Sequence, residues 1–144
     1  MTQTIIVADD HPLFRAALKQ AVSQAVPDAK TVEVDSIKAL QAAVESHPDA
    51  DLVLLDLNMP GAHGFSGLVF MRGQYPGLPV VVVSGSEEMQ VMRRSIDYGA
   101  SGFIPKSAPL PTITEAIQAV LEGDVWLPEG VADKIERMLS LIHI

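Results

Sequence analysis

The feature that most limits the fold of this chain is a short apolar run that ends in a carboxylate. Residues 52–55 read Leu-Val-Leu-Leu, and Asp56 follows them directly. An unbroken run of this length, followed by turn-forming residues, is typical of a strand buried on both faces. Because such strands belong to the middle of a parallel sheet, we expect Asp56 to emerge at the carboxyl ends of the strands, where these sheets bind ligands.

Four other short runs and five amphipathic segments alternate along the chain. The predicted strands cover residues 4–8, 31–34, 52–55, 79–83 and 103–104, and the predicted helices cover about 12–26, 36–46, 64–75, 87–98 and 110–122. Strand–helix alternation predicts right-handed βαβ units and a parallel sheet with helices on both faces. The strand at 31–34 alternates apolar and polar residues, so we place it nearer a sheet edge. The helix at 64–75 is expected to be short and mobile, because Gly67 and Gly73 each cost up to about 1 kcal/mol relative to Ala.

Length and composition exclude several classes of protein. The 144 residues are enough for one domain with a sizeable core. The absence of cysteine excludes disulfide scaffolds, thiol catalysis and thiolate metal sites, and we expect a cytoplasmic protein without a signal peptide or membrane segment. A net charge of -8 argues against this segment gripping nucleic acid by itself, and favours cations or basic partners.

Carboxylates follow two of the predicted strands. Asp9 and Asp10 come after the first strand, and Asp56 ends the third. One common strand order of doubly wound sheets, 2-1-3-4-5, makes these strands neighbours with a crevice between them. Three clustered carboxylates repel one another, and an all-oxygen site relieves that repulsion best with Mg²⁺, with Mn²⁺ as the alternative. The simpler interpretation is that Asp9 and Asp10 form only a turn and a helix cap.

Asp56 could act as a metal ligand, a general base or a nucleophile that forms an aspartyl phosphate. Phosphoryl transfer needs positive charge near the transferred oxygens, and Lys106 after the fifth strand could supply it. Ser84, at the end of the fourth strand, could donate its hydroxyl to a phosphate oxygen. Taken alone, Lys106 could equally be a solvated lysine after a strand, and Ser84 could equally be a turn residue. All these residues, however, are expected to meet at the carboxyl ends of the strands.

Together these motifs resemble the receiver domain of two-component response regulators. The resemblance covers about residues 4–122 and rests on four motifs, which are Asp9-Asp10, Asp56 with Asn58 and Pro60-Gly61, Ser84-Gly85, and Lys106 after Gly102-Phe103-Ile104-Pro105. Residues 11–15, 99–103 and 126–128 are similar to the LuxR/NarL-type branch. The resemblance implies a flavodoxin-like α/β fold, a doubly wound five-stranded parallel sheet of order 2-1-3-4-5.

The same resemblance implies roles for individual residues. Asp56 corresponds to the phospho-acceptor, Asp10 and Asp56 to direct Mg²⁺ ligands, Asp9 to a ligand through water, and Asn58 to a ligand through its backbone carbonyl. Ser84 and Lys106 correspond to the phosphate-binding pair. Phe103 occupies the position where the family often has a rotating Tyr, so Ser84 and Phe103 are the expected switch residues. Independently of the resemblance, we expect His11 to be an exposed first-turn residue near the site and not a metal ligand.

The resemblance also implies partners and domain boundaries. We expect a sensor histidine kinase to phosphorylate Asp56, a homodimer on phosphorylation, and transcriptional control of DNA through a C-terminal helix-turn-helix domain that this chain lacks. Residues 1–123 are assigned to the receiver domain, and residues 124–138, with an apolar stripe after Pro128, to a linker helix. Residues 139–144 match one translation of a transposon end used in library preparation, so we expect a non-native tail.

Two other functions fit the pattern less well. A haloacid-dehalogenase-like phosphatase needs a second Asp two residues after its nucleophile, but Asn58 and His11 stand at those places after Asp56 and Asp9. A flavin- or nucleotide-binding module needs a Gly- or Ser/Thr-rich loop after the first strand, where two carboxylates would repel phosphate unless a metal were present. The expected protein is therefore a phosphorylation-controlled switch, catalysing only its own phosphoryl transfer and dephosphorylation, and not an enzyme with an external substrate.

Overall fold

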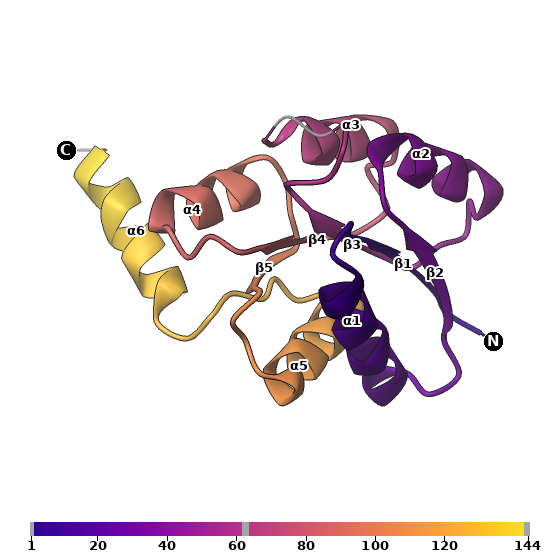
Figure 1. Cartoon of the computed structure of the whole chain (residues 1–144). Coiled ribbons are helices and arrows are strands. Elements are labelled where there is room, and N and C mark those ends of the chain that lie inside the picture. The colour runs from indigo at the N-terminus through magenta and orange to yellow at the C-terminus, as the bar shows by residue number, and fades with distance from the viewer. Residues whose placement is uncertain (1, 62–63, 143–144) are drawn as a thin grey trace.

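Five parallel strands form a single sheet in the order β2-β1-β3-β4-β5 in the computed structural model, which describes residues 2–61 and 64–142 (Figure 1). The strands are β1 (Thr4–Ala8), β2 (Lys30–Val34), β3 (Leu52–Asp56), β4 (Val80–Ser84) and β5 (Gly102–Pro105). The predicted fold class and strand order are confirmed. The alternating strand predicted near an edge is β2, which pairs only with β1 in the described sheet.

Helices cover both faces of the sheet, with α2, α3 and α4 on one side and α1 and α5 on the other (Figure 1). Their bounds are α1 (Pro12–Ala25), α2 (Ile37–Ser46), α3 (Ser66–Gln74), α4 (Met89–Asp97), α5 (Leu110–Leu121) and α6 (Val131–Ile142). The five predicted helices and the helix after Pro128 are therefore all present. Helix α6 continues to Ile142, past the predicted end of the linker at 138.

Each buried strand sends alternate side chains into two separate hydrophobic cores, as the pleat of a strand requires. In β3, Leu52 and Leu54 face α1 and α5, whereas Val53 and Leu55 face α2, α3 and α4. Every residue of β1, β3, β4 and β5 is buried. This two-sided burial explains why their sequences are unbroken apolar runs rather than alternating ones.

Local sequence signals fix several helix ends. The Ser36 hydroxyl accepts a hydrogen bond from the Ala39 N–H at 3.1 Å, which makes Ser36 the N-cap of α2. Pro12 occupies the first turn of α1, where its missing N–H leaves no hydrogen bond unmade. Helix α4 begins at Met89, slightly later than predicted. Glu88 before it has an extended backbone, and its N–H donates a hydrogen bond to the Ser86 hydroxyl at 3.2 Å.

Gly67 in α3 has a packing role that the sequence did not reveal. A Cβ atom at this buried position would lie 2.8 Å from Cδ1 of Ile37 in α2. The glycine therefore leaves room for the end of the Ile37 side chain between α2 and α3. A Cβ at Gly73, in contrast, would have no neighbour within 4 Å, so Gly73 has no such role.

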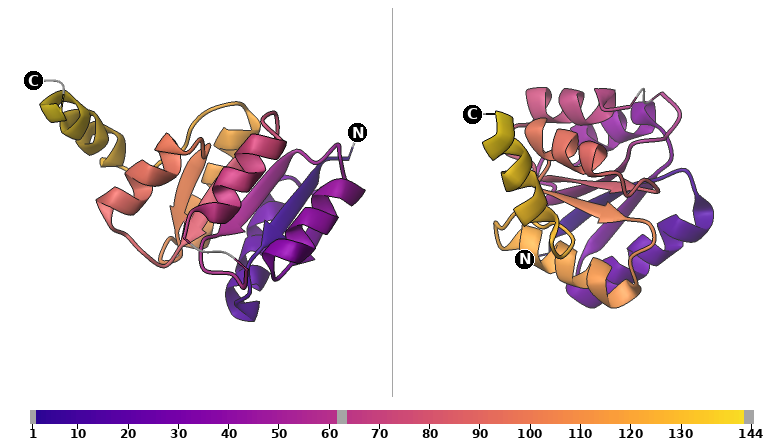
Figure 2. Two further views of the ribbon diagram at one scale, coloured as in Figure 1. Left: turned by 90° about the horizontal axis from the view of Figure 1, so that it is seen from above. Right: turned by 90° about the vertical axis from the view of Figure 1, so that its left-hand side faces the viewer.

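The chain after α5 returns to the sheet before α6 begins. Trp126 forms an isolated bridge with Gly102 of β5, which ties this segment to the edge of the sheet. Helix α6 then lies beside α4 at the β5 end of the sheet (Figure 2), and Val131 and Ile135 are buried in the same core as Met92. Among the described residues no helix combines the length and apolar character needed to cross a membrane.

Candidate functional site

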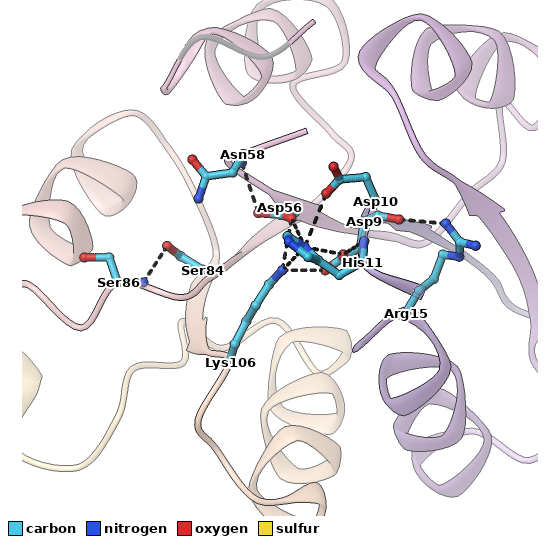
Figure 3. A network of polar contacts seen from close by, with 9 residues as sticks. All are labelled: Asp9, Asp10, His11, Arg15, Asp56, Asn58, Ser84, Ser86 and Lys106. Atoms are coloured by element: carbon cyan, nitrogen blue, oxygen red, sulfur yellow. Dashed lines mark hydrogen bonds and ion pairs between the residues drawn. The ribbon is translucent and has the colours of Figure 1, made fainter. Parts of the chain in front are cut away.

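The strand register brings the predicted carboxylates together at one edge of the sheet (Figure 3). Ala8 pairs with Leu55, so Asp9 and Asp56 leave two neighbouring strands side by side. The side chains of both are completely buried, whereas that of Asp10 is 31% exposed. Charged side chains are rarely buried without a partner, so this edge must provide compensating groups.

Backbone amides two residues further along the chain orient both buried carboxylates. The His11 N–H donates to Asp9 Oδ1 at 2.7 Å, and the Asn58 N–H donates to Asp56 Oδ1 at 3.0 Å. Such hydrogen bonds to an ionised acceptor are stronger than neutral ones. Each bond fixes one oxygen, and in both residues the other oxygen, Oδ2, lies near Lys106.

Lys106 reaches the carboxylates from the end of β5. Its backbone N–H donates to the Ser84 carbonyl oxygen at 2.8 Å, which ties the start of the β5–α5 loop to β4. Its Nζ lies 3.1 Å from Asp56 Oδ2 and 3.1 Å from Asp9 Oδ2, and only 18% of the side chain is exposed. The ammonium group also lies 5.0 Å from the centre of the Phe14 ring. One cation therefore stands between two buried anions, where little solvent screens it.

Positive charge at this edge does not balance the three carboxylates, and two of their oxygens lack hydrogen bonds. Asp9 Oδ2 and Asp10 Oδ1 are buried and accept no hydrogen bond, although Lys106 Nζ lies 3.1 Å from the first and His11 Nδ1 lies 3.3 Å from the second. Both contacts are therefore ion pairs without a well-aligned hydrogen bond. Oxygen donors, negative charge and unsatisfied lone pairs fit a hard divalent cation.

His11 is the residue at this site whose contacts sequence reasoning missed. Its side chain is 60% exposed and near the carboxylates, as expected, but its Nδ1 atom lies 3.3 to 3.4 Å from an oxygen of Asp9, Asp10 and Asp56. Ligand atoms of these four residues lie within 4.8 Å of one another. One feature of the sequence pointed to this position. His11 lies between Asp10 and Pro12, the first residue of α1, and this place in the chain holds it next to the carboxylates.

Comparison with known families adds to this geometry. Residues 5–118 match the family described as the response regulator receiver domain, and this segment contains all three clustered carboxylates and the described strands except for Thr4 of β1. The chain belongs to the response regulator receiver family. Members of this family are phosphoryl-accepting switches that bind Mg²⁺ at an acidic pocket, and Asp9, Asp10 and Asp56 form an acidic cluster in this chain.

Relatives of this receiver domain are regulators of the NarL/LuxR type. The chain is 43% identical to a glycerol metabolism activator of Pseudomonas putida, over 88% of this chain and 58% of that protein. It is 32% identical to the nitrate/nitrite response regulator NarL of Escherichia coli K12, over 94% of this chain and 62% of that protein. A LuxR family DNA-binding response regulator of Silicibacter pomeroyi has 31% identity and a TM-score of 0.77, with 88% and 98% of the two chains covered. The chain thus spans about 60% of the length of these curated relatives.

The two predicted switch residues of the receiver domain lie apart from the carboxylates. Ser84 is buried, and its hydroxyl oxygen accepts a hydrogen bond from the Ser86 N–H at 3.1 Å (Figure 3). No hydrogen bond joins Ser84 to Asp56 within the part of the chain that the structure describes. Phe103 is fully buried in the core beneath α4. The structure therefore brings Asp9, Asp10, Asp56 and Lys106 into one cluster, with Ser84 at its border.

Proposed function

We propose that this receiver domain accepts a phosphoryl group on Asp56 from a sensor histidine kinase and passes the signal to an output domain that controls transcription. The observation that carries the proposal is the setting of Asp56, a buried carboxylate with Oδ1 fixed by the Asn58 N–H and Oδ2 paired with Lys106. A nucleophile held by fixed donors at a ligand-binding edge is arranged for in-line phosphoryl transfer, which depends on positioning and electrostatics.

In this reaction an oxygen of Asp56 forms a bond to phosphorus while the phosphorus–nitrogen bond to the kinase imidazole breaks. The departing imidazole nitrogen takes a proton from solvent and leaves as a neutral ring. Lys106, which pairs with Asp56 Oδ2 before transfer, then stays beside the new phosphoryl oxygens as their counter-charge. Dephosphorylation is the attack of water on the same phosphorus, which breaks its bond to Asp56. In both reactions the phospho-acceptor belongs to the switch itself, and no external substrate is turned over.

The residues present fit a divalent cation, for which Mg²⁺ is our proposal and Mn²⁺ the alternative. Asp10 and Asp56 would bind it directly, Asp9 through water, and Asn58 through its backbone carbonyl. The buried oxygens without hydrogen bonds on Asp9 and Asp10 support this assignment. When bound, the cation supplies positive charge to the transferred phosphoryl oxygens.

The phosphoryl group would act on Ser84 and Phe103. In this structure the Ser84 hydroxyl is bound to the Ser86 amide of the β4–α4 loop. A new phosphoryl oxygen offers a stronger, charged acceptor, so we propose that the hydroxyl turns towards Asp56 and carries the loop with it. Phe103 has no hydroxyl to bond, so its response would be a change of packing under α4.

Helix α6 offers a route from α4 to the output domain. Val131 and Ile135 of α6 share a hydrophobic core with Met92 of α4, so a shift of α4 would disturb the docking of α6. We therefore propose that residues 1–123 form the receiver domain and residues 124–138 the linker to a DNA-binding helix-turn-helix domain. A homodimer on phosphorylation would form through the α4–β5 surface or the α1–α5 face.

The test is phosphorylation of the purified chain by a small-molecule donor, acetyl phosphate, with and without Mg²⁺. We expect the mass of one phosphoryl group to be added in Mg²⁺ and not after EDTA treatment. Asp56→Asn should abolish the gain, because an amide oxygen is a poor nucleophile towards phosphorus. Asp35→Asn is the matched control, since Asp35 is an exposed carboxylate after β2 at the same sheet edge.

A second measurement locates the response. Beryllofluoride with Mg²⁺, added to the 15N-labelled chain, should shift the amide signals of Asn58, Ser86 and Lys106 while those of the α2 C-terminus stay unchanged. Phosphoryl uptake that persists in Asp56→Asn, or amide spectra that do not respond to beryllofluoride, would refute the proposed function.

A further inference from the structure

The orientation of His11 is unusual for a residue at the start of a helix. It is the N-cap of α1, but its side chain makes no capping hydrogen bond. Instead the imidazole turns into the carboxylate cluster, where Nδ1 lies 3.3 Å from Asp9 Oδ1, 3.3 Å from Asp10 Oδ1 and 3.4 Å from Asp56 Oδ2 (Figure 3). Three carboxylates from two strands thus share one ring nitrogen as a neighbour.

These separations resemble those between neighbouring ligands of one metal ion. Ligand atoms about 2.1 Å from an octahedral metal lie about 3.0 Å apart when they are adjacent, by simple geometry. The distance from His11 Nδ1 exceeds that separation by only a few tenths of an ångström for Asp10 Oδ1 and Asp56 Oδ2, which belong to the two residues proposed to bind the cation directly. The four ligand atoms also lie within 4.8 Å of one another. A small contraction would therefore place nitrogen and oxygen atoms around one cation.

A cation already lies beside the ring nitrogen of His11. Lys106 Nζ lies 2.8 Å from His11 Nδ1. An ammonium group only donates hydrogen bonds, so the tautomer with its proton on Nε2 would accept one at Nδ1, and that tautomer also leaves the Nδ1 lone pair to a metal.

A separate observation concerns the carboxylate oxygen next to His11. Asp10 Oδ1 is buried and accepts no hydrogen bond, although His11 Nδ1 lies 3.3 Å from it. Asp9 Oδ2 also accepts none, but the Lys106 ammonium group lies 3.1 Å away and compensates part of its charge. A buried carboxylate oxygen without a hydrogen bond is expensive unless a cation binds there. Phosphoryl transfer as proposed above uses the carboxylates and Lys106, and it leaves His11 without a task.

We propose that His11 is a nitrogen ligand of the divalent cation in this receiver domain, and that it shifts the preference of the site towards Co²⁺, Ni²⁺ and related transition metals. The inference rests on the cation site of the proposed function. Imidazole suits the later first-row metals, whereas Mg²⁺ prefers oxygen ligands and keeps its water. Replacing one water by imidazole therefore gains more free energy for Co²⁺ than for Mg²⁺.

The test is a calorimetric titration of the untagged chain with Co²⁺ and with Mg²⁺. We expect His11→Ala to weaken Co²⁺ binding about tenfold or more and Mg²⁺ binding by less than about threefold. Folding is not at risk, because the His11 side chain is 60% exposed and caps nothing. His47→Ala is the matched control, since His47 lies at the C-cap of α2, and it should change neither affinity.

Proton NMR of the Co²⁺ form supplies a readout that does not depend on affinity. The paramagnetic ion should strongly shift the signals of the ring protons of a ligating histidine. We expect these shifted signals in the unsubstituted chain and in His47→Ala, and we expect them to be lost in His11→Ala. Equal weakening of Co²⁺ and Mg²⁺, or shifted ring protons that survive in His11→Ala, would overturn the role of His11 alone. Failure of both cations to bind, or binding unchanged by Asp56→Asn, would overturn the cation site of the proposed function as well.

Discussion

Gly102→Ala tests the docking of the segment after α5 on the sheet. A Cβ atom at Gly102 would lie 2.9 Å from the carbonyl oxygen of Trp126, a backbone atom that cannot rotate away. Carbon–oxygen contacts normally stay beyond about 3.3 Å, so the Trp126 carbonyl must retreat by several tenths of an ångström. That carbonyl accepts a hydrogen bond from the Phe103 N–H at 3.2 Å, and the Trp126 N–H donates to the Ser101 carbonyl at 3.0 Å. The substitution therefore strains or breaks both bonds.

The expected magnitude follows from these two hydrogen bonds. Each contributes about 1 kcal/mol to stability, so their loss costs about 2 kcal/mol. Alanine lowers the entropy of the unfolded chain relative to glycine, which returns about 0.5 to 1 kcal/mol. We expect Gly102→Ala to lower the free energy of unfolding by about 1 to 1.5 kcal/mol. Gly73→Ala has the same chemistry, but its Cβ meets nothing within 4 Å in α3, so it should raise stability by about 0.5 to 1 kcal/mol.

Urea unfolding followed by the fluorescence of Trp126, the single tryptophan, measures both variants. We expect midpoints on opposite sides of that of the parent chain, about 1 M apart for a typical urea dependence of a small domain. Amide exchange of Trp126 should also become faster in Gly102→Ala than in Gly73→Ala. If Gly102→Ala is as stable as Gly73→Ala, Trp126 does not dock on β5 as described.

Three further substitutions test the site, a helix end and the linker. Asp10→Asn should raise the free energy of unfolding in EDTA by about 1 kcal/mol, because it removes repulsion equal to the Coulomb energy of two unit charges about 4 Å apart in water. The same substitution should remove the stabilisation of the folded chain by Mg²⁺, and an unchanged response to Mg²⁺ would contradict the cation site. Ser36→Ala should cost about 1 kcal/mol in thermal or urea unfolding because the N-cap of α2 is lost, whereas Ser36→Asp should retain most of it. Ile135→Ala should cost about 2 kcal/mol and expose α6 to limited proteolysis, whereas Lys134→Ala, at an exposed position of α6, should do neither.

Much of the fold could be predicted because burial leaves a direct trace in the sequence. The run Val80–Val83 is apolar throughout because both faces of β4 are covered, and Leu18, Ala21 and Val22 recur at helical intervals because one side of α1 is buried. The role of Gly67 could not be predicted. The role of this glycine depends on the position of the Ile37 side chain in another helix, whereas helix propensity alone predicts only that the glycine is destabilising.

The site divides in the same way. Asp9, Asp10, Asp56 and Lys106 could be proposed as neighbours because parallel strands all end at one edge of the sheet, so residues after strands must meet there. The contact of His11 with that cluster could not be predicted. A residue at a helix start can turn outwards or inwards, and its rotamer is decided by carboxylates and an ammonium group that other strands bring.

Local apolar patterns and residue types are enough to predict which residues are buried, where the chain turns and which chemical groups stand at the strand ends. Contacts between segments distant in sequence arise only when the whole chain folds. These contacts place the Asp9 and Asp56 oxygens around Lys106, turn His11 inwards and set Trp126 against Gly102. Such contacts depend on strand order and register, and these are fixed only when all the apolar faces of the chain are buried together.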